Sequence, residues 1–262
     1  MRSSLIFFAA LVCLVMAGCG GSGNSTPVNL QSGNWSVAAT SAVTLDGSFT
    51  AGGSLVQTGS TISGVVHIPA SKCFRGDLDV AVTGSVTGQT MSLSFAATPD
   101  QTINVDAKAG SATTFSGTYT VTGTGCAAGD HGTINATLVP SVSAPWQGVF
   151  TSVVNPGTVV TFTATLTQSP TADAHGFFPV TGTLTVTGTS CLTSGAILAT
   201  SNMSGANMNL FATADGQPTS NTIFMEGPMD DPATATSISK GQGGVSGANC
   251  PSDNGHGSMS RS

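Results

Sequence analysis

The chain has 262 residues, of which only 7% are charged and 34 are glycine, and its formal net charge is −6. After the first few residues the cations are five scattered side chains: Lys72, Arg75, Lys108, Lys240 and Arg261. A nucleic-acid-binding protein needs clustered basic residues to neutralise phosphates. That class of function is therefore excluded, and electrostatic attraction to anionic lipid headgroups is not expected either.

The first eighteen residues have the pattern of an export signal. Arg2 precedes an apolar run from Leu5 to Met16, and small residues follow before Cys19. The run is too short to cross a bilayer as a helix, and this order of basic, apolar and small residues is typical of a secretory signal peptide. We predict a signal peptide over residues 1–18. The alternative is ordinary signal-peptidase cleavage that removes Cys19 or leaves it as a free thiol.

Residues Val15-Met16-Ala17-Gly18-Cys19 resemble the lipobox of bacterial lipoproteins, with Met16 where that motif usually has Leu. The resemblance implies acylation of Cys19, and hence attachment to a lipid bilayer of the bacterial cell envelope. Gly20 stands where an Asp usually signals retention in the inner membrane, so the resemblance implies the outer membrane. Residues 19–32 are rich in Gly and Ser and are predicted to form a flexible tether.

The remainder of the chain is an internal duplication. Four residue types recur in the same order at a slowly growing offset, as expected for two copies of one module with loop insertions in the second: Trp35 and Trp146, Cys73 and Cys191, Cys126 and Cys250, His131 and His256. Chance similarity in a biased composition is the alternative, but it does not explain the shared order. We predict one module over residues 33–141 and a second over residues 142–262.

The duplication also selects a disulfide pattern. Four cysteines remain after Cys19, and four cysteines allow three connectivities. If each module is self-contained, the pairs are Cys73–Cys126 and Cys191–Cys250. Export supplies an oxidising compartment in which such bonds persist. The alternative, a four-thiolate metal site, lacks the Cys-x-x-Cys spacing that such sites use.

Alternation of apolar and polar residues predicts the fold class. Val160, Phe162, Ala164 and Leu166 alternate with threonines, and the same period of two recurs in both modules. Turn signals recur every eight to twelve residues, Gly52-Gly53 among them. The mean hydropathy of +0.24 argues against disorder. We predict an all-β fold of two tandem antiparallel meander modules, either small barrels or sandwiches.

Two short motifs of the first module resemble the calycin-like β-barrels, the group of lipocalins and avidins. Gly33-Asn34-Trp35 opens the module as a Gly-x-Trp, and residues 111–119 resemble an avidin-type strand pair. The second module departs from the pattern with Ala144-Pro145-Trp146, and has Gly243 where the first has Tyr119. The resemblance implies a barrel; it carries over no ligand residue. The composition as a whole is similar to that of bacterial surface lipoproteins of unknown function.

Two features of the sequence, one repeated and one clustered, contain residues that can bind a metal. His131 and His256 occupy the same place in each module, with Asp130 and Asp253 beside them, and an acid–His pair can bind a metal or move a proton; a turn leading into the last strand is the favoured alternative. Met203 and Met208, with three further methionines, could hold copper through thioether sulfur, but core packing is favoured. No metal or other cofactor is predicted.

Catalytic motifs are not found in the sequence. The acid pairs Asp77/Asp79 and Asp230/Asp231 could be imagined as a glycosidase pair, but both are predicted to be solvated loop acids. We therefore expect a non-catalytic, membrane-anchored lipoprotein that serves as a binding or structural module for an unknown macromolecule of the envelope. The alternative is a carrier that holds a small apolar ligand inside a barrel, with Phe177-Phe178 and the methionines as lining.

Overall fold

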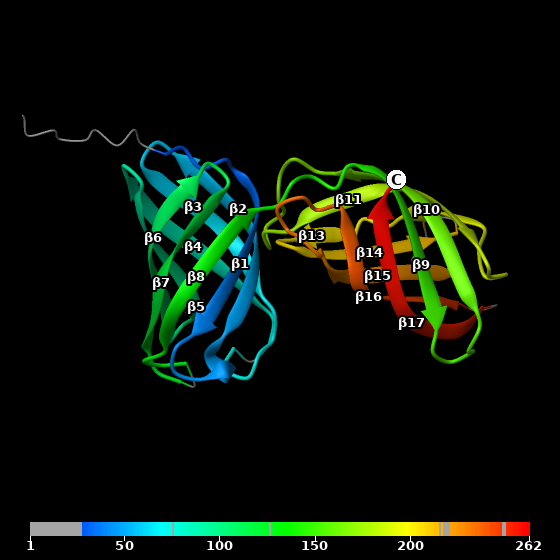
Figure 1. Ribbon diagram of the computed structural model, residues 1–262, viewed down its shortest axis with the longest axis horizontal. Helices are drawn as coiled ribbons and strands as arrows, with labels where there is room; N and C mark the ends of the chain where they lie inside the picture. The colour runs from blue at the N-terminus through cyan, green and yellow to red at the C-terminus, as the bar shows by residue number, and fades with distance from the viewer. Residues whose placement is uncertain (1–27, 75, 126, 215, 217–220, 248–249) are drawn as a thin grey trace, which may run out of the picture.

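The computed structural model describes residues 28–262 except 75, 126, 215, 217–220 and 248–249. The predicted signal peptide, Cys19 and most of the tether lie outside the described residues. Two closed antiparallel β-barrels lie side by side along the long axis of the molecule (Figure 1). The predicted all-β fold with two tandem antiparallel modules is confirmed, and the modules are barrels and not sandwiches.

The first barrel is an eight-stranded meander. Each strand pairs with the next along the chain, and the barrel closes where β1 pairs with β8. A short 3-10 helix, η1 (Leu45–Gly47), lies between β1 and β2. The strands are β1 (Gly33–Ser41), β2 (Phe49–Thr58), β3 (Thr61–Ile68), β4 (Leu78–Thr87), β5 (Thr90–Thr98), β6 (Gln101–Ser111), β7 (Thr114–Gly123) and β8 (His131–Leu138).

The second barrel repeats this topology with one broken strand. Strands β12 and β13 both pair with β11 and with β14, so together they take the place that β4 has in the first barrel. Pairing of β10 with β11 completes the ring. The strands are β9 (Ala144–Ser152), β10 (Val159–Gln168), β11 (Phe178–Thr187), β12 (Ser194–Ile197), β13 (Asn202–Ser204), β14 (Asn207–Thr213), β15 (Thr222–Pro228), β16 (Ser237–Gly247) and β17 (Cys250–Arg261).

Matching hydrogen bonds show the duplication. Trp35 and Trp146 are fully buried, and each indole N–H donates to the backbone carbonyl four residues earlier, at 3.1 and 2.9 Å. Gln57 and Gln168 end the second strand of each barrel, and each side-chain oxygen accepts a backbone N–H from the segment before the tryptophan strand, at 2.8 and 3.0 Å. The same anchor therefore holds the start of both barrels.

At one pair of interior positions, the two barrels place the large and the small residue the opposite way round. In the first barrel Tyr119 on β7 is buried, and β1 contributes the small Ala39. At the corresponding positions the second barrel has Gly243 on β16 and Phe150 on β9, where a Cβ on Gly243 would lie 2.8 Å from Cβ of Phe150. Phe150 therefore fills the space that a side chain at 243 would need, since a closed barrel of eight strands has room for only one large group there.

One predicted disulfide lies within the described residues. Cys191, between β11 and β12, is bonded to Cys250 at the start of β17, with Cα atoms 5.0 Å apart. The bond closes a loop with a sequence separation of 59. Cys73 is also disulfide-bonded, while its predicted partner Cys126 lies outside the described residues.

The contact between the barrels uses backbone at very close range. The buried Asn34 side chain on β1 donates to the carbonyl oxygen of Gly205 at 2.9 Å and accepts its N–H at 2.7 Å. Gly205 lies against Gly52 of β2, where an added Cβ would be 2.4 Å from the Gly205 nitrogen. The predicted turn at Gly52-Gly53 is therefore wrong: both residues lie inside β2, and Gly52 allows the second barrel to approach.

Candidate functional site

The interior of the first barrel is occupied by large side chains in contact with one another. Trp35 packs on Phe115 with ring centroids 5.4 Å apart, and Phe49 packs on Tyr119 at 5.5 Å and on Phe74 at 5.3 Å. These side chains are all buried. Small barrels are commonly filled in this way.

The second barrel contains a small apolar void of about 10 Å³, bordered among others by Phe162, Leu184 and Met225. A void of this size holds no more than about one water molecule. Of the predicted lining pair, Phe178 is buried in the core of the second barrel, whereas Phe177 lies on its outside and packs against His67 of the first barrel. This void is therefore too small to hold a stored apolar molecule.

The weighed metal candidates do not come together. His131 at the start of β8 and His256 in the middle of β17 are exposed, while Met203 and Met208 are fully buried partners across β13 and β14. Among the residues that the structure describes, no group of three or more His, Cys, Asp or Glu side chains could hold a metal ion. The methionines thus pack the core, as favoured from their spacing.

The acids beside the repeated histidines secure the end of the first strand of each barrel. Ser41 donates to Asp130 at 2.6 Å, and the corresponding Ser152 donates to Asp253 at 2.5 Å. Tyr119 also donates to Asp130 at 3.0 Å, and burial followed by this hydrogen bond raises the pKa of Tyr119 to about 12. These acids therefore have structural partners in both barrels.

The predicted turn at the repeated histidines is confirmed only once. A turn over residues 127–129 precedes β8 and His131. In the second barrel β17 begins earlier, at Cys250, so Asp253 and His256 lie inside the strand and pair with Val245 and Gln242 of β16. Sheet pairing extends through this region because β16 supplies a partner along most of its length.

The acid pairs Asp77/Asp79 and Asp230/Asp231 were predicted to lie in loops. For Asp79 this prediction is wrong. Asp79 lies in β4 of the first barrel, where its two carboxylate oxygens meet His67 at 3.0 Å and His175 of the second barrel at 2.6 Å. Burial acts to raise the pKa of Asp79, but hydrogen bonds from the two histidines outweigh it and lower the pKa. The hydrogen bond to Asp79 raises the pKa of His175. Sequence reasoning missed this cluster because its members are far apart along the chain.

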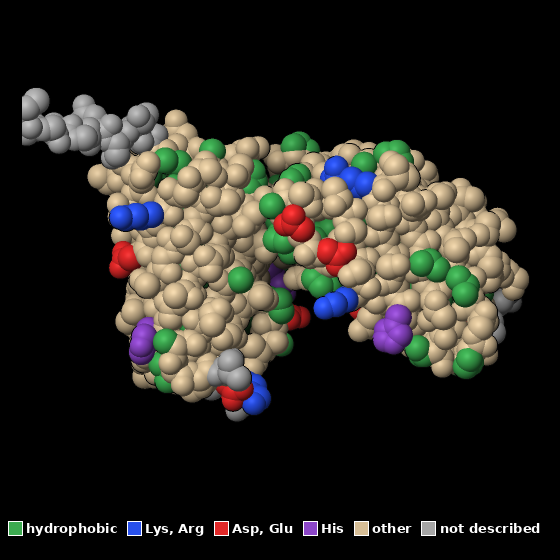
Figure 2. Space-filling model, viewed as in Figure 1, with side chains coloured by type: hydrophobic (Ala, Val, Ile, Leu, Met, Phe, Trp, Pro, Cys, Tyr) green, Lys and Arg blue, Asp and Glu red, His purple; other side chains and the backbone are tan. Residues whose placement is uncertain are grey.

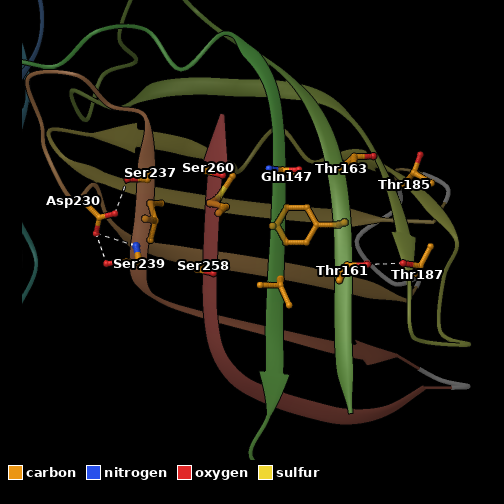
Figure 3. Close-up of a pocket in the computed structure, with 15 residues that line it drawn as sticks. Gln147, Thr161, Thr163, Thr185, Thr187, Asp230, Ser237, Ser239, Ser258 and Ser260 are labelled. Atoms are coloured by element: carbon orange, nitrogen blue, oxygen red, sulfur yellow. Dashed lines mark hydrogen bonds between the residues drawn. The ribbon is translucent and has the colours of Figure 1, made fainter. Parts of the chain in front are cut away.

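A hollow on the second barrel, which we call the outer groove, has a volume of about 610 Å³ and crosses the outer face of β16, β17, β9, β10 and β11. Figure 3 shows hydroxyl-bearing side chains along its length, from Ser237 and Ser239 at one end to Thr185 and Thr187 at the other. Thr161 and Thr187 face one another with oxygens 2.6 Å apart. The alternating threonines predicted from the sequence thus produce a hydroxyl-lined surface.

The chemistry of the outer groove is neutral apart from one carboxylate. Asp230 accepts hydrogen bonds from Ser237 at 2.6 Å and from Ser239 at 2.5 and 3.0 Å, and these bonds lower the pKa of Asp230 (Figure 3). None of the fifteen described residues that line the groove is Lys or Arg. Such a surface can hydrogen-bond a neutral polar partner, and it has no cation with which to bind a phosphate.

A second hollow, which we call the interbarrel cleft, has a volume of about 520 Å³ and is lined by side chains of both barrels. Figure 2 shows it as a notch between the barrels, with acidic, basic and histidine side chains along its sides. Its lining includes His67 of the first barrel and Phe177, Glu226 and Lys240 of the second.

Comparison with known proteins adds little. Neither a protein-family model nor a curated protein matches the chain. Among solved structures, it is similar to a protein of unknown function of the DUF3598 family from Nostoc punctiforme PCC 73102, at 9% sequence identity over 90% of this chain and 96% of that chain. The TM-score is 0.24, and at that value the likeness carries no argument.

Among the described residues, no helix has both the length and the apolar character that crossing a membrane requires.

Proposed function

We propose that this chain is a non-catalytic lipoprotein of the bacterial cell envelope, anchored in the outer membrane through acylated Cys19, that binds a macromolecule of the envelope on the outside of its barrels. The observation that carries the proposal is the contrast between interior and surface. The interior of the second barrel has a void of about 10 Å³, whereas the outer groove measures about 610 Å³ and is lined by hydroxyl groups.

Other features support export and anchoring. A disulfide between Cys191 and Cys250 is consistent with an oxidising compartment. The lipobox-like residues Val15 to Cys19 and the small polar residues after them supply the anchor and tether. The first module is an eight-stranded meander and the second repeats its topology with one broken strand, which supports the resemblance to calycin-like barrels suggested by Gly33-Asn34-Trp35.

The anchor is tested by metabolic labelling with an alkyne-bearing palmitate, followed by membrane fractionation. The wild-type protein is expected to carry the label and to sediment with the outer membrane. Cys19→Ser is expected to lose the label and appear in the soluble fraction. A wild-type protein that is secreted without label would refute the anchor.

Binding is tested by co-sedimentation of the protein with purified envelope fragments. In the outer groove, Thr163 and Thr185 are register partners on β10 and β11, and replacing both with Val removes two hydroxyls while keeping the side-chain shape. The matched control replaces Thr118 and Thr133, register partners on the outside of the first barrel. The groove variant is expected to sediment less than wild type, and the control equally. Equal sedimentation of both variants would contradict the role of the outer groove.

A further inference from the structure

The interbarrel cleft contains an ordered line of hydrogen-bonding side chains, which we call the polar row. It consists of Asn202 on β13, Asn209 on β14, Glu226 on β15 and Gln242 on β16. Each is the direct register partner of the next, so neighbouring members are about 4.8 Å apart, the spacing of paired strands. All four line the cleft.

The polar row faces outward because of strand alternation. The sequence neighbours of three members are methionines that point into the core. Met203 follows Asn202, Met208 precedes Asn209, and Met225 precedes Glu226; all three methionines are buried. The row itself is partly or fully exposed, and the Asn209 amide donates to the Asn202 oxygen at 3.4 Å. A linear set of three amides and one carboxylate can therefore meet a ligand that lies across the strands.

An aromatic ring of the second barrel also lines the cleft. Phe177 lies on the loop before β11 and packs edge-on against His67 of the first barrel, with ring centroids 5.0 Å apart. It is half-buried, and it lines the cleft together with Thr50 of β2. An aromatic face carries partial negative charge, so it attracts the polarised C–H groups of a sugar ring.

The formal charges of the Glu and Lys side chains that line the cleft sum to zero, which suits a neutral ligand. Glu226 is the only glutamate of the chain and lies within the polar row. Lys240 lines the same cleft. Amides donate and accept hydrogen bonds equally well, as do the hydroxyls of a sugar. A cavity of about 520 Å³ between two domains is within the range and the usual location of ligand sites.

We propose that the interbarrel cleft binds a neutral saccharide, whose hydroxyls pair with the polar row and whose ring stacks on Phe177. This inference goes beyond the proposed function, since it assigns a ligand class to a second site, separate from the outer groove, to which both barrels contribute.

The test is isothermal titration of the full-length exported protein, in detergent, with maltohexaose, cellohexaose and chitohexaose. At least one neutral hexamer is expected to bind, and Asn209→Ala and Gln242→Ala are each expected to weaken binding at least about fivefold. Asn135→Ala, on the outside of the first barrel, is the matched control and is expected to bind as wild type. Glu226→Gln leaves the charge of Lys240 without an opposite charge in the cleft lining, and is expected to gain affinity for anionic hexagalacturonate.

A measurement on the unaltered protein accompanies the variants, because it does not depend on their folding. The side-chain amide resonances of Asn209 and Gln242 are expected to shift on addition of the hexamer, while that of Asn135 on the first barrel stays in place. Binding that is insensitive to Asn209 and Gln242 overturns the proposal.

The failure of this proposal is distinguishable from failure of the proposed function. If none of the three hexamers binds while the protein still sediments with envelope fragments, the saccharide site is refuted and the envelope-binding function stands. If it neither binds a hexamer nor sediments, both are refuted.

Discussion

The second barrel has Phe150 and Gly243 where the first has Ala39 and Tyr119, and this difference predicts how substitutions at the two positions change the free energy of unfolding. Phe150 is fully buried, so Phe150→Ala is expected to destabilise the second barrel by about 3–5 kcal/mol. Gly243→Tyr is expected to cost at least about 1–3 kcal/mol, because even a Cβ there would lie 2.8 Å from Cβ of Phe150. If the two sites were independent, the double variant would lose the sum of the two costs.

The structure predicts instead that the double variant recovers much of the loss. Phe150→Ala with Gly243→Tyr recreates the Ala39 and Tyr119 arrangement of the first barrel. The new tyrosine also has Asp253 available as the counterpart of Asp130. We expect a favourable interaction free energy of about 2 kcal/mol between the two substitutions, which is within the range for contacting core residues.

The assay is urea unfolding of the oxidised protein, monitored by tryptophan fluorescence. Trp35→Phe in every variant leaves Trp146 as the reporter of the second barrel, because the two barrels need not unfold together. The converse exchange in the first barrel, Ala39→Phe with Tyr119→Gly, serves as the control, and there Trp146→Phe replaces Trp35→Phe so that Trp35 reports the first barrel. Free energies of unfolding that add simply in the double variant would refute the reasoning.

Three further predictions concern the links within and between the barrels. Asn34→Ala removes both hydrogen bonds to the backbone of the second barrel; increased interbarrel motion is expected in small-angle X-ray scattering, and an unchanged profile would contradict the role of this contact. In an NMR titration the pKa of His175 is expected above the usual value of about 6.5 and to fall back in Asp79→Asn. Since the pKa of His175 is raised and that of Asp79 is lowered, the stabilisation from this pair is complete between their ordinary pKa values, 3.8 for Asp and 6.5 for His, and is lost as pH rises through the raised pKa of His175 or falls through the lowered pKa of Asp79; an interbarrel contact that does not change with pH would contradict this. Replacing Cys191 and Cys250 with Ala is expected to lower the free energy of unfolding by about 2–5 kcal/mol in chemical denaturation, and an unchanged midpoint would contradict this.

Much of the fold could be predicted because its signals are local. Alternation of apolar and threonine residues is visible over ten residues, and it requires one buried and one exposed face wherever the strand pairs. The recurrence of Trp35 as Trp146, each with its indole hydrogen bond, marks the two copies. For the candidate sites the sequence predicted the outer threonines, and it favoured core packing for Met203 and Met208, which are buried.

The sequence by itself therefore determined the strand content, the duplication and the Cys191–Cys250 pairing. Only the tertiary structure decided that the modules are barrels, that Gly52 is a contact with Gly205, and that Asp79 joins histidines of two barrels. The physical reason is that these features depend on which outer faces meet. Close approach of two backbones requires glycine, and in a single sequence a glycine that permits such approach has the same appearance as one that forms a turn.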